Sequence, residues 1–305
     1  MCIGIWTLEH PEYALILCTN RDEYLDRPTE DAHFHSFGKE INAESPGTIL
    51  SGRDVLAGGS WFGINRSGKV SLLTNITEPV KKYNTSRGYL VSSFLQSDSP
   101  RPLDEIGKII PMNEKFAGFN LLLLAPTPDT DSSIQYDSLY ITNHGGGGTL
   151  TSRPLRPSEH SCGGISNGID GAGAESWFKV QHATKEFEAV LQTLTPNDDT
   201  ASELTDRLFK LLAWQPPDSI LQRSDLRKTV QVTPIPLILE GSRGGSQGYY
   251  GTRLSTVLLV KRNGDVLFIE RDIWKLVNGA PVRADPSSER RFEFKLDIKS
   301  TVNDN

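Results

Sequence analysis

The chain has 305 residues, of which 37% are hydrophobic and 23% charged, so it is long enough to bury a large core as a globular protein. Its 32 basic and 38 acidic residues give a net charge of −6, and no stretch concentrates Lys and Arg. Nucleic-acid surfaces and polybasic membrane patches need clustered positive charge, so this composition excludes both.

The cysteines and the first residues indicate where in the cell the protein is located. Cys2, Cys18 and Cys162 form no CxxC pair, and an odd number of cysteines is typical of free thiols in a reducing compartment. No positive side chain precedes Arg21, which argues against a secretory signal or an Arg-rich transit peptide. The apolar runs are too short to span a bilayer. We therefore expect a cytoplasmic protein without a transmembrane segment.

The first two β-rich runs, residues 2–8 and 13–19, are separated by polar residues and predict a hairpin. The start of one strand in an antiparallel pair lies beside the end of the other, so the segment Asn20-Arg21-Asp22-Glu23 is expected near Cys2. The alternative for this segment is a polar turn that opens a loop.

Cys2 would become the N-terminal residue on removal of Met1. It would then carry both a thiol and a free α-amino group, which ordinarily titrates at about 7.7 to 8.0 and can act as general base for the thiol. The alternative interpretation is a small apolar residue on a buried first strand. The sequence thus predicts either a nucleophile or a core residue at this position.

A second hairpin is predicted around the turn at residues 66–69, with a strand of residues 70–74 that ends at Asn75. An asparagine at a strand end is usually a turn residue, and alternatively an amide donor that faces a reacting centre. Asn167 closes a short Gly-rich segment, and the same two interpretations apply to it.

The remaining elements favour paired helices and hairpins rather than βαβ units. Apolar periodicity predicts helices at residues 87–96, 103–110, 176–194 and 202–214. Apolar runs predict strands at residues 119–124, 138–142, 255–260 and 265–270. Such an inventory favours sheets covered by helical layers.

The loops and the chain end set the expected domain boundaries. Residues 126–133 predict a polar loop, and the Gly-rich segment 240–251 predicts either a loop beside a pocket or a disordered stretch. The sequence from residue 285 is polar. We therefore expect one domain of residues 1–284 and a polar tail of residues 285–305.

No cofactor or metal is expected. The six histidines form no HExxH motif or Cys/His cluster, and the alternation of His33 and His35 is a weak metal signal. The glycine run at residues 145–148 lacks the Lys-Ser/Thr that a phosphate-binding loop requires.

Several short motifs occur in order along the chain. They are Met1-Cys2, Asn20-Arg21-Asp22-Glu23, Gly52-Arg53-Asp54 with Gly58-Gly59-Ser60-Trp61, Thr74-Asn75, Gly164-Ile165-Ser166-Asn167 and Tyr250-Gly251-Thr252-Arg253. The ordered set closely resembles the NRDE-motif family, known as the transport and Golgi organization protein 2 family. That family is in turn similar to the cysteine branch of the N-terminal nucleophile hydrolases, which includes penicillin V acylase and bile salt hydrolase. The resemblance implies an α+β fold, a four-layer αββα sandwich with antiparallel sheets.

The resemblance also implies roles around the thiol. Cys2 matches the nucleophile, Arg21 the arginine beside it, and Arg253 a late arginine near the thiol. Asp22 or Glu23 matches the acid that orients the α-amino group. Positive charge lowers the pKa of a nearby thiol, so the two arginines would favour the thiolate. A surface ion pair is the alternative for Arg253.

By the same resemblance, Asn75 and Asn167 match positions that stabilise an oxyanion, where each donor is typically worth about 3 kcal/mol. Residues 168–174 make the loop after Asn167 longer than the usual family pattern, and the similarity resumes at Trp177. A turn is the alternative role for Asn167.

Two classes of function follow. The resemblance implies a part in Golgi organization, protein secretion and intracellular transport, with a small acyl, lipid or haem ligand and association with the Golgi or mitochondria. The alternative is a cysteine-type amidohydrolase that cleaves a non-peptide amide or thioester with Cys2 as nucleophile. A fold by itself does not decide between them.

Overall fold

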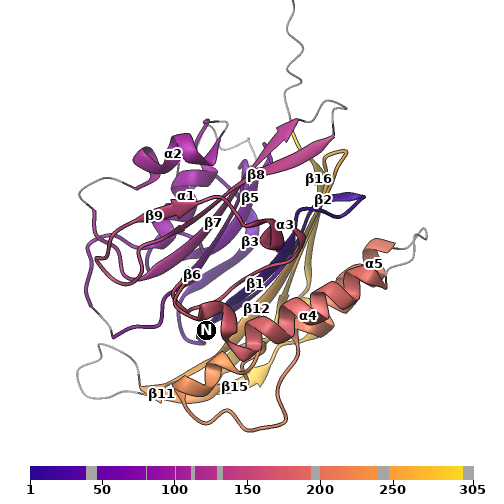
Figure 1. The fold of residues 1–305 in the computed structure, drawn as a ribbon. Helices are drawn as coiled ribbons and strands as arrows, with labels where there is room; N and C mark the ends of the chain where they lie inside the picture. The colour runs from indigo at the N-terminus through magenta and orange to yellow at the C-terminus, as the bar shows by residue number, and fades with distance from the viewer. Residues whose placement is uncertain are drawn as a thin grey trace, which may run out of the picture.

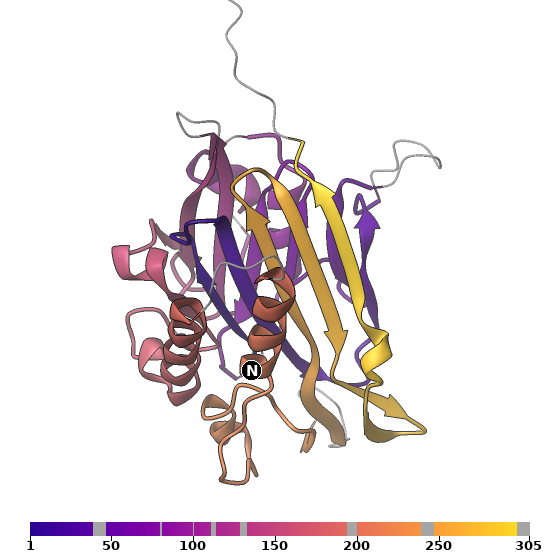
Figure 2. The same ribbon diagram turned by 90° about the vertical axis from the view of Figure 1, so that its right-hand side faces the viewer.

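The computed structural model describes residues 1–38, 47–79, 81–99, 101–110, 114–128, 133–193, 200–238 and 247–297. Two seven-stranded antiparallel sheets stack face to face, and helices cover the outer face of each sheet (Figures 1 and 2). The architecture is therefore an α+β sandwich of four layers, αββα, and the predicted fold class is confirmed.

The first sheet has the strand order β10-β1-β2-β12-β13-β16, and β11 pairs with β12. Its strands are β1 (Ile3–Thr7), β2 (Tyr13–Tyr24), β10 (Gly163–Ile165), β11 (Ile235–Ile238), β12 (Gln247–Lys261), β13 (Asp265–Asp272) and β16 (Arg290–Lys295). Leu15 and Leu17 of β2 pack against the other sheet, whereas Ile16 and Cys18 pack under helices. Burial on both faces explains the nearly continuous apolar run of β2.

The second sheet is a meander in which each strand pairs with its neighbours in sequence. Its strands are β3 (Thr29–His35), β4 (Ile49–Asp54), β5 (Phe62–Asn65), β6 (Val70–Asn75), β7 (Phe119–Pro128), β8 (Ile134–Thr142) and β9 (Thr151–Arg153). Alternate residues of β7 again face opposite layers: Leu122 and Leu124 the other sheet, Leu121 and Leu123 the helices. A separate hairpin joins β14 (Trp274–Val277) to β15 (Ala280–Arg283).

Two pairs of helices form the outer layers. They are α1 (Gly88–Leu95) and α2 (Pro102–Ile109) on the second sheet, and α4 (Phe178–Gln192) and α5 (Thr200–Leu212) on the first. A short helix, α3 (Pro157–Ser161), lies beside β1 and β10. Phe94 of α1 and Phe187 of α4 are fully buried against their sheets. The four helices predicted from apolar periodicity are confirmed.

Strand pairing shows that three segments predicted as turns or loops belong wholly or partly to strands. Asn20 to Glu23 continues β2 and pairs with β12, so the alternative of a polar turn there is wrong. Residues 126–128 belong to β7 and residues 247–251 to β12. Residue 133 lies outside the strands, as predicted, and residues 129–132 and 240–246 of these loops lie outside the described residues.

The polar tail expected from residue 285 does not begin there. Residues 286–288 form a 3-10 turn, and β16 pairs with β13 as the edge of the first sheet. Phe292 and Phe294 alternate with charged residues and pack against the core between the sheets, where Phe34 contacts both rings. The period-two pattern of this strand outweighs its polar composition.

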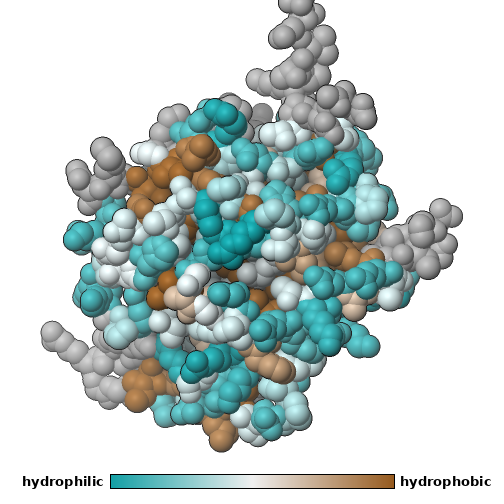
Figure 3. Space-filling view, viewed as in Figure 1, coloured by the Kyte–Doolittle hydropathy of each residue, from teal (hydrophilic) through white to brown (hydrophobic). Residues whose placement is uncertain are grey.

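The face shown in Figure 3 is mainly hydrophilic, and polar side chains separate its apolar patches. A prominent apolar patch lies at the upper left, where Figure 1 places α1 and α2. Leu103 of α2 is exposed. Exposed apolar residues are common on protein surfaces. Within the described ranges, no helix is long and apolar enough to cross a membrane.

Candidate functional site

The pairing of β1 with β2 brings the N-terminus beside the Asn20–Glu23 segment. Ile3 lies opposite Asn20, so Met1 and Cys2 lie alongside the end of β2. β12 runs along the other edge of β2, with Thr252 opposite Asp22 and Gly251 opposite Glu23. The expected proximity of Cys2 to this segment is confirmed.

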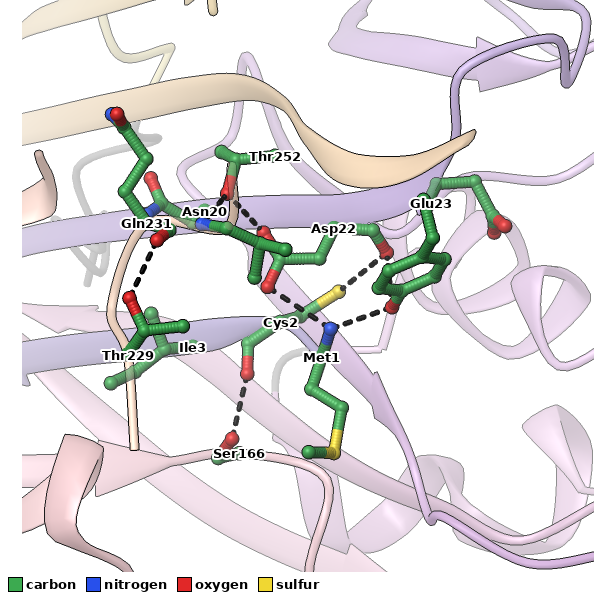
Figure 4. A network of polar contacts seen from close by, with 12 residues as sticks. Met1, Cys2, Ile3, Asn20, Asp22, Glu23, Ser166, Thr229, Gln231 and Thr252 are labelled. Carbon is green, nitrogen blue, oxygen red and sulfur yellow. Dashed lines mark hydrogen bonds and ion pairs between the residues drawn. The ribbon is translucent and has the colours of Figure 1, made fainter. Parts of the chain in front are cut away.

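Met1 is 5% exposed, and its amine and carbonyl groups contact buried polar residues. The amine lies 3.0 Å from Asp22 Oδ2 and donates to the Tyr250 hydroxyl at 2.6 Å (Figure 4). The Met1 carbonyl oxygen accepts a hydrogen bond from Lys179 Nζ at 2.5 Å. The structure thus fixes the first residue at both its amine and its carbonyl.

Asp22 is the acid that contacts the N-terminal amine. Its side chain is fully buried, Oδ1 accepts a 2.6 Å hydrogen bond from Thr252 Oγ1, and Oδ2 lies 3.8 Å from Lys179 Nζ. The Glu23 carboxylate instead accepts from the Tyr24 backbone amide and lies 4.0 Å from Arg27. Of the two acids left open by the sequence, the structure therefore places Asp22 at the amine.

The thiol of Cys2 opens into a small cavity of about 120 Å³. Arg21, Asn75 and Arg87 are among the side chains that line this cavity with it. Burial raises the pKa of the thiol, and the positive N-terminus opposes this only in part. With Met1 in place, the thiol is therefore protonated at neutral pH.

Asn20 and Arg21 are held by different contacts. Asn20 Nδ2 donates to the carbonyls of Leu212 and Val230, and Ser255 Oγ donates to its Oδ1, so Asn20 ties the strand to the segment after α5. The Arg21 guanidinium stacks 3.8 Å from the centre of the Trp61 ring. Burial lowers the pKa of Arg21 to about 10, which leaves it a cation near neutral pH. Asn20 is thus structural, whereas Arg21 supplies charge to the cavity.

Asn75 and Asn167 both line a larger cavity of about 420 Å³ that adjoins the first, and Asn75 lines both. Asn167 Oδ1 is buried and accepts no hydrogen bond among the described residues. Asn120 Nδ2 holds the loop around Asn167 through the carbonyls of Ser166 and Gly168. The structure therefore brings both predicted amides to one cavity, Asn75 at the end of β6 and Asn167 on the loop that Asn120 holds.

Arg253 is placed differently from the expectation. The register between β2 and β12 shifts between Thr252 and Leu254, so Arg253 is an additional residue at a β-bulge, which redirects a side chain. Its guanidinium donates to the Arg27 carbonyl oxygen. Among the described residues, Arg253 does not line either cavity.

Comparison with known proteins identifies the family. The sequence model described as Transport and Golgi organisation 2 matches residues 1–275. The chain belongs to this family. The Transport and Golgi organization 2 homolog of Mus musculus is 32% identical over 267 residues, which cover 86% of this chain and 87% of that protein. The homolog of Bos taurus is 30% identical over 290 residues, 93% of each chain.

Solved structures give weaker similarities. An N-acylethanolamine-hydrolyzing acid amidase ortholog of Caenorhabditis elegans covers 85% of this chain and 92% of its own, at 10% identity and a TM-score of 0.46. The C2A mutant of conjugated bile acid hydrolase from Clostridium perfringens covers 98% of both chains, at 10% identity and a TM-score of 0.42. The four-layer fold of this family member is established by its own sheet topology.

Sequence reasoning missed three residues of the site in this family member. Arg87 lines both cavities and donates to the Gly118 carbonyl at 2.9 Å, whereas the sequence around it predicts only the start of a helix. Tyr250 was assigned only to a motif. The position of Lys179 could have been predicted in part. It shares the buried face of α4 with Ala183 and Phe187, and a lysine on an apolar helix face is rarely buried without an acidic or carbonyl partner.

The larger cavity has a lining of mixed charge. Arg27, Lys81, Arg87 and Arg223 contribute positive side chains, and Asp22, Glu23, Asp26 and Glu78 contribute negative ones. The described residues contain no group of three or more His, Cys, Asp and Glu side chains arranged to hold a metal ion. The site offers a thiol, amides and charges of both signs.

Proposed function

We propose that this chain takes part in transport and Golgi organization, as the names of its relatives state, and that it does so as a cysteine acyl hydrolase. Its substrate would be a small non-peptide amide or thioester, and Cys2 would be the nucleophile after removal of Met1. One observation carries the proposal: the Cys2 thiol shares a cavity with Arg21, Asn75 and Arg87, while Asp22 holds the amine of Met1, the residue whose removal exposes the Cys2 amine.

The reaction needs no cofactor. The Cys2 amine takes the thiol proton, and the thiolate attacks the carbonyl carbon of the substrate. Asn75 and Asn167 donate to the oxyanion, and each such donor typically contributes about 3 kcal/mol. The carbonyl then re-forms, the leaving amine or thiol departs with the proton from the Cys2 ammonium, and a thioester remains. Water hydrolyses this thioester, releases the carboxylic acid and restores the thiol.

We expect a covalent acyl adduct on Cys2. The trimmed chain is incubated with short- and long-chain acyl thioesters and N-acyl amides, and its intact mass is then measured. A gain equal to one acyl group, lost on treatment with hydroxylamine, supports the thioester.

Two variants locate the adduct. Cys2→Ala removes the nucleophile and should abolish the mass gain. Cys162→Ala removes a thiol whose pKa is raised to about 12 by burial, so it should leave the gain unchanged. If no acyl donor modifies the wild-type chain, or if the adduct persists in Cys2→Ala, the hydrolase proposal is rejected.

We expect Lys179→Met to move the acidic limb of the pH–rate profile for thioester formation to higher pH by about one unit. In the chain that keeps Met1, burial lowers the pKa of the Met1 amine from its ordinary 8.0, Asp22 raises it, and Lys179 lowers it. After trimming, we expect the Lys179 charge to act in the same direction on the Cys2 amine, which lies one residue further along the chain. Removing the Lys179 charge raises the pKa of the amine, so a higher pH is needed to form the neutral base. Lys185→Met, at an exposed position of the same helix, should leave the profile in place.

A second candidate is a binding module for an acyl, lipid or haem ligand at the cytoplasmic face of the Golgi or mitochondria. It is favoured by the raised pKa of the thiol and by the large cavity that remains open with Met1 in place. Expression of Cys2→Ala in a strain that lacks the protein separates the two candidates. Full rescue by this variant supports the binding module, and loss of rescue by a folded, abundant variant supports the hydrolase.

A further inference from the structure

We infer that removal of Met1 leaves a preformed site for an α-amino acid with an unbranched side chain. The inference rests on the trimming of Met1, which the proposed function also needs, but not on the chemistry of the thiol. Met1 itself shows how the site holds such a group, because its amine, carbonyl and side chain each contact buried residues.

The amine subsite is built from fixed groups. Asp22 Oδ2 lies 3.0 Å from the Met1 amine, and the Tyr250 hydroxyl accepts from it at 2.6 Å. The Tyr250 hydroxyl donates in turn to the Asp22 carbonyl oxygen at 3.0 Å, and Thr252 holds the other oxygen of the carboxylate. Both acceptors therefore keep their positions when the Met1 amine is gone, and they favour a primary ammonium group.

The carbonyl subsite contains a buried cation. The Lys179 side chain is fully buried, and its ammonium donates to the Met1 carbonyl oxygen at 2.5 Å. Trimming removes this acceptor and leaves Asp22 Oδ2, 3.8 Å away, as the partner of the buried ammonium, so one of its hydrogen bonds is lost. A ligand carboxylate or carbonyl at the same place restores the contact. Asp22 and Lys179 thus recognise an amine and a carbonyl at the spacing found in one amino acid.

The side-chain subsite is mainly apolar. Met1 packs with Leu226, Val232 and Ile235, and Thr77 Oγ1 donates to its sulfur at 3.1 Å. These contacts fit an unbranched thioether chain, and we expect a branched side chain to pack less well beside them. The adjoining cavity carries charges of both signs, which suits a zwitterion.

The test is calorimetric titration of the mature chain, trimmed with methionine aminopeptidase where needed and verified by intact mass. The ligands are L-methionine, its isostere L-norleucine, L-isoleucine, N-acetyl-L-methionine and 4-(methylthio)butanoate. Saturable binding of methionine and norleucine is expected. Loss of the free amine should weaken binding about 10-fold or more, because a charge-assisted hydrogen bond is lost. Branching of the side chain should also weaken binding, because a branched chain packs less well in the side-chain subsite.

Two tyrosine variants make the test specific. Tyr250→Phe removes the hydroxyl at the amine subsite and should weaken methionine about 10-fold while leaving 4-(methylthio)butanoate unchanged. Tyr24→Phe is the matched control, because Tyr24 lines the same cavity but its hydroxyl donates to the Ile238 carbonyl. The inference is overturned if methionine does not bind, or if the ligand without an amine binds equally well. A Cys2 adduct without methionine binding rejects this inference alone, and methionine binding without an adduct rejects only the hydrolase.

Discussion

Replacement of Asp22 by asparagine is expected to lower the free energy of unfolding by about 3 to 5 kcal/mol, because it removes one partner of a buried ion pair. The carboxylate lies between the N-terminal amine and Lys179, and all three groups are shielded from solvent. An asparagine keeps a contact with Thr252 but leaves the two cations without a counter-charge. Urea unfolding followed by tryptophan fluorescence measures the loss.

The destabilisation caused by Asp22→Asn should decrease as the pH rises. Burial lowers the pKa of the N-terminal amine in the folded chain below its ordinary 8.0, and loss of Asp22 lowers it further. Below pH 8 the unfolded amine is protonated, so folding of the variant must release this proton or bury its charge. The unfolded amine is the same in both chains, so the difference from wild type should shrink as the pH rises toward the folded-state pKa of the wild-type amine, which lies below 8.0, and should stay constant above it.

A matched control is Asp206→Asn. Asp206 is 70% exposed and lies 3.5 Å from Arg271, so its loss should change the free energy of unfolding by less than about 1 kcal/mol. Equal destabilisation by the two variants would contradict a special role for Asp22. A cost for Asp22→Asn that does not change between pH 6 and pH 9 would contradict its coupling to the amine.

The fold could be predicted from the sequence where the physical signal is local. The β1–β2 hairpin follows from two β-rich runs around a Pro-containing turn, and α5 follows from the spacing of Leu204, Leu208, Leu211 and Leu212. β16 was missed because its polar composition was given more weight than the alternation of Phe292 and Phe294. That strand lies beyond the part of the chain that the family model matches.

The site was predictable only in part, because its geometry depends on register. Cys2 and Asp22 are placed together by a short hairpin, and that contact follows from the sequence. Tyr250 reaches the amine because β12 pairs with β2 in one particular register, and the bulge at Arg253 ends the regular alternation of side chains. No local pattern encodes a register between strands more than 200 residues apart, so Tyr250 and the direction of Arg253 required the structure.

Replacement of Arg290 by glutamine is expected to lower the free energy of unfolding by about 3 kcal/mol or more at neutral pH. Arg290 lies on β16, 3.0 Å from the buried carboxylate of Glu270, and also pairs with Asp272. Among the described residues, Glu270 also accepts a hydrogen bond from the backbone amide of Ala32, which ties β13 to β3 of the other sheet. Loss of Arg290 leaves the Glu270 carboxylate without its counter-charge between the two sheets, and thermal unfolding measures the result.

A lower pH should reduce the destabilisation caused by Arg290→Gln, and this pH dependence distinguishes it from a general loss of packing. Burial raises the pKa of Glu270 above its ordinary 4.5, and Arg290 opposes that rise. The variant therefore has a still higher Glu270 pKa, and its folded state takes up a proton at a pH where the unfolded state has none. Its stability relative to wild type should increase as the pH falls from 7 toward 5. Arg291→Gln, on the exposed face of the same strand, should show neither effect because Arg291 pairs only with Glu293 among the described residues. If Arg290→Gln behaves like this control, β16 contributes little to holding the two sheets together.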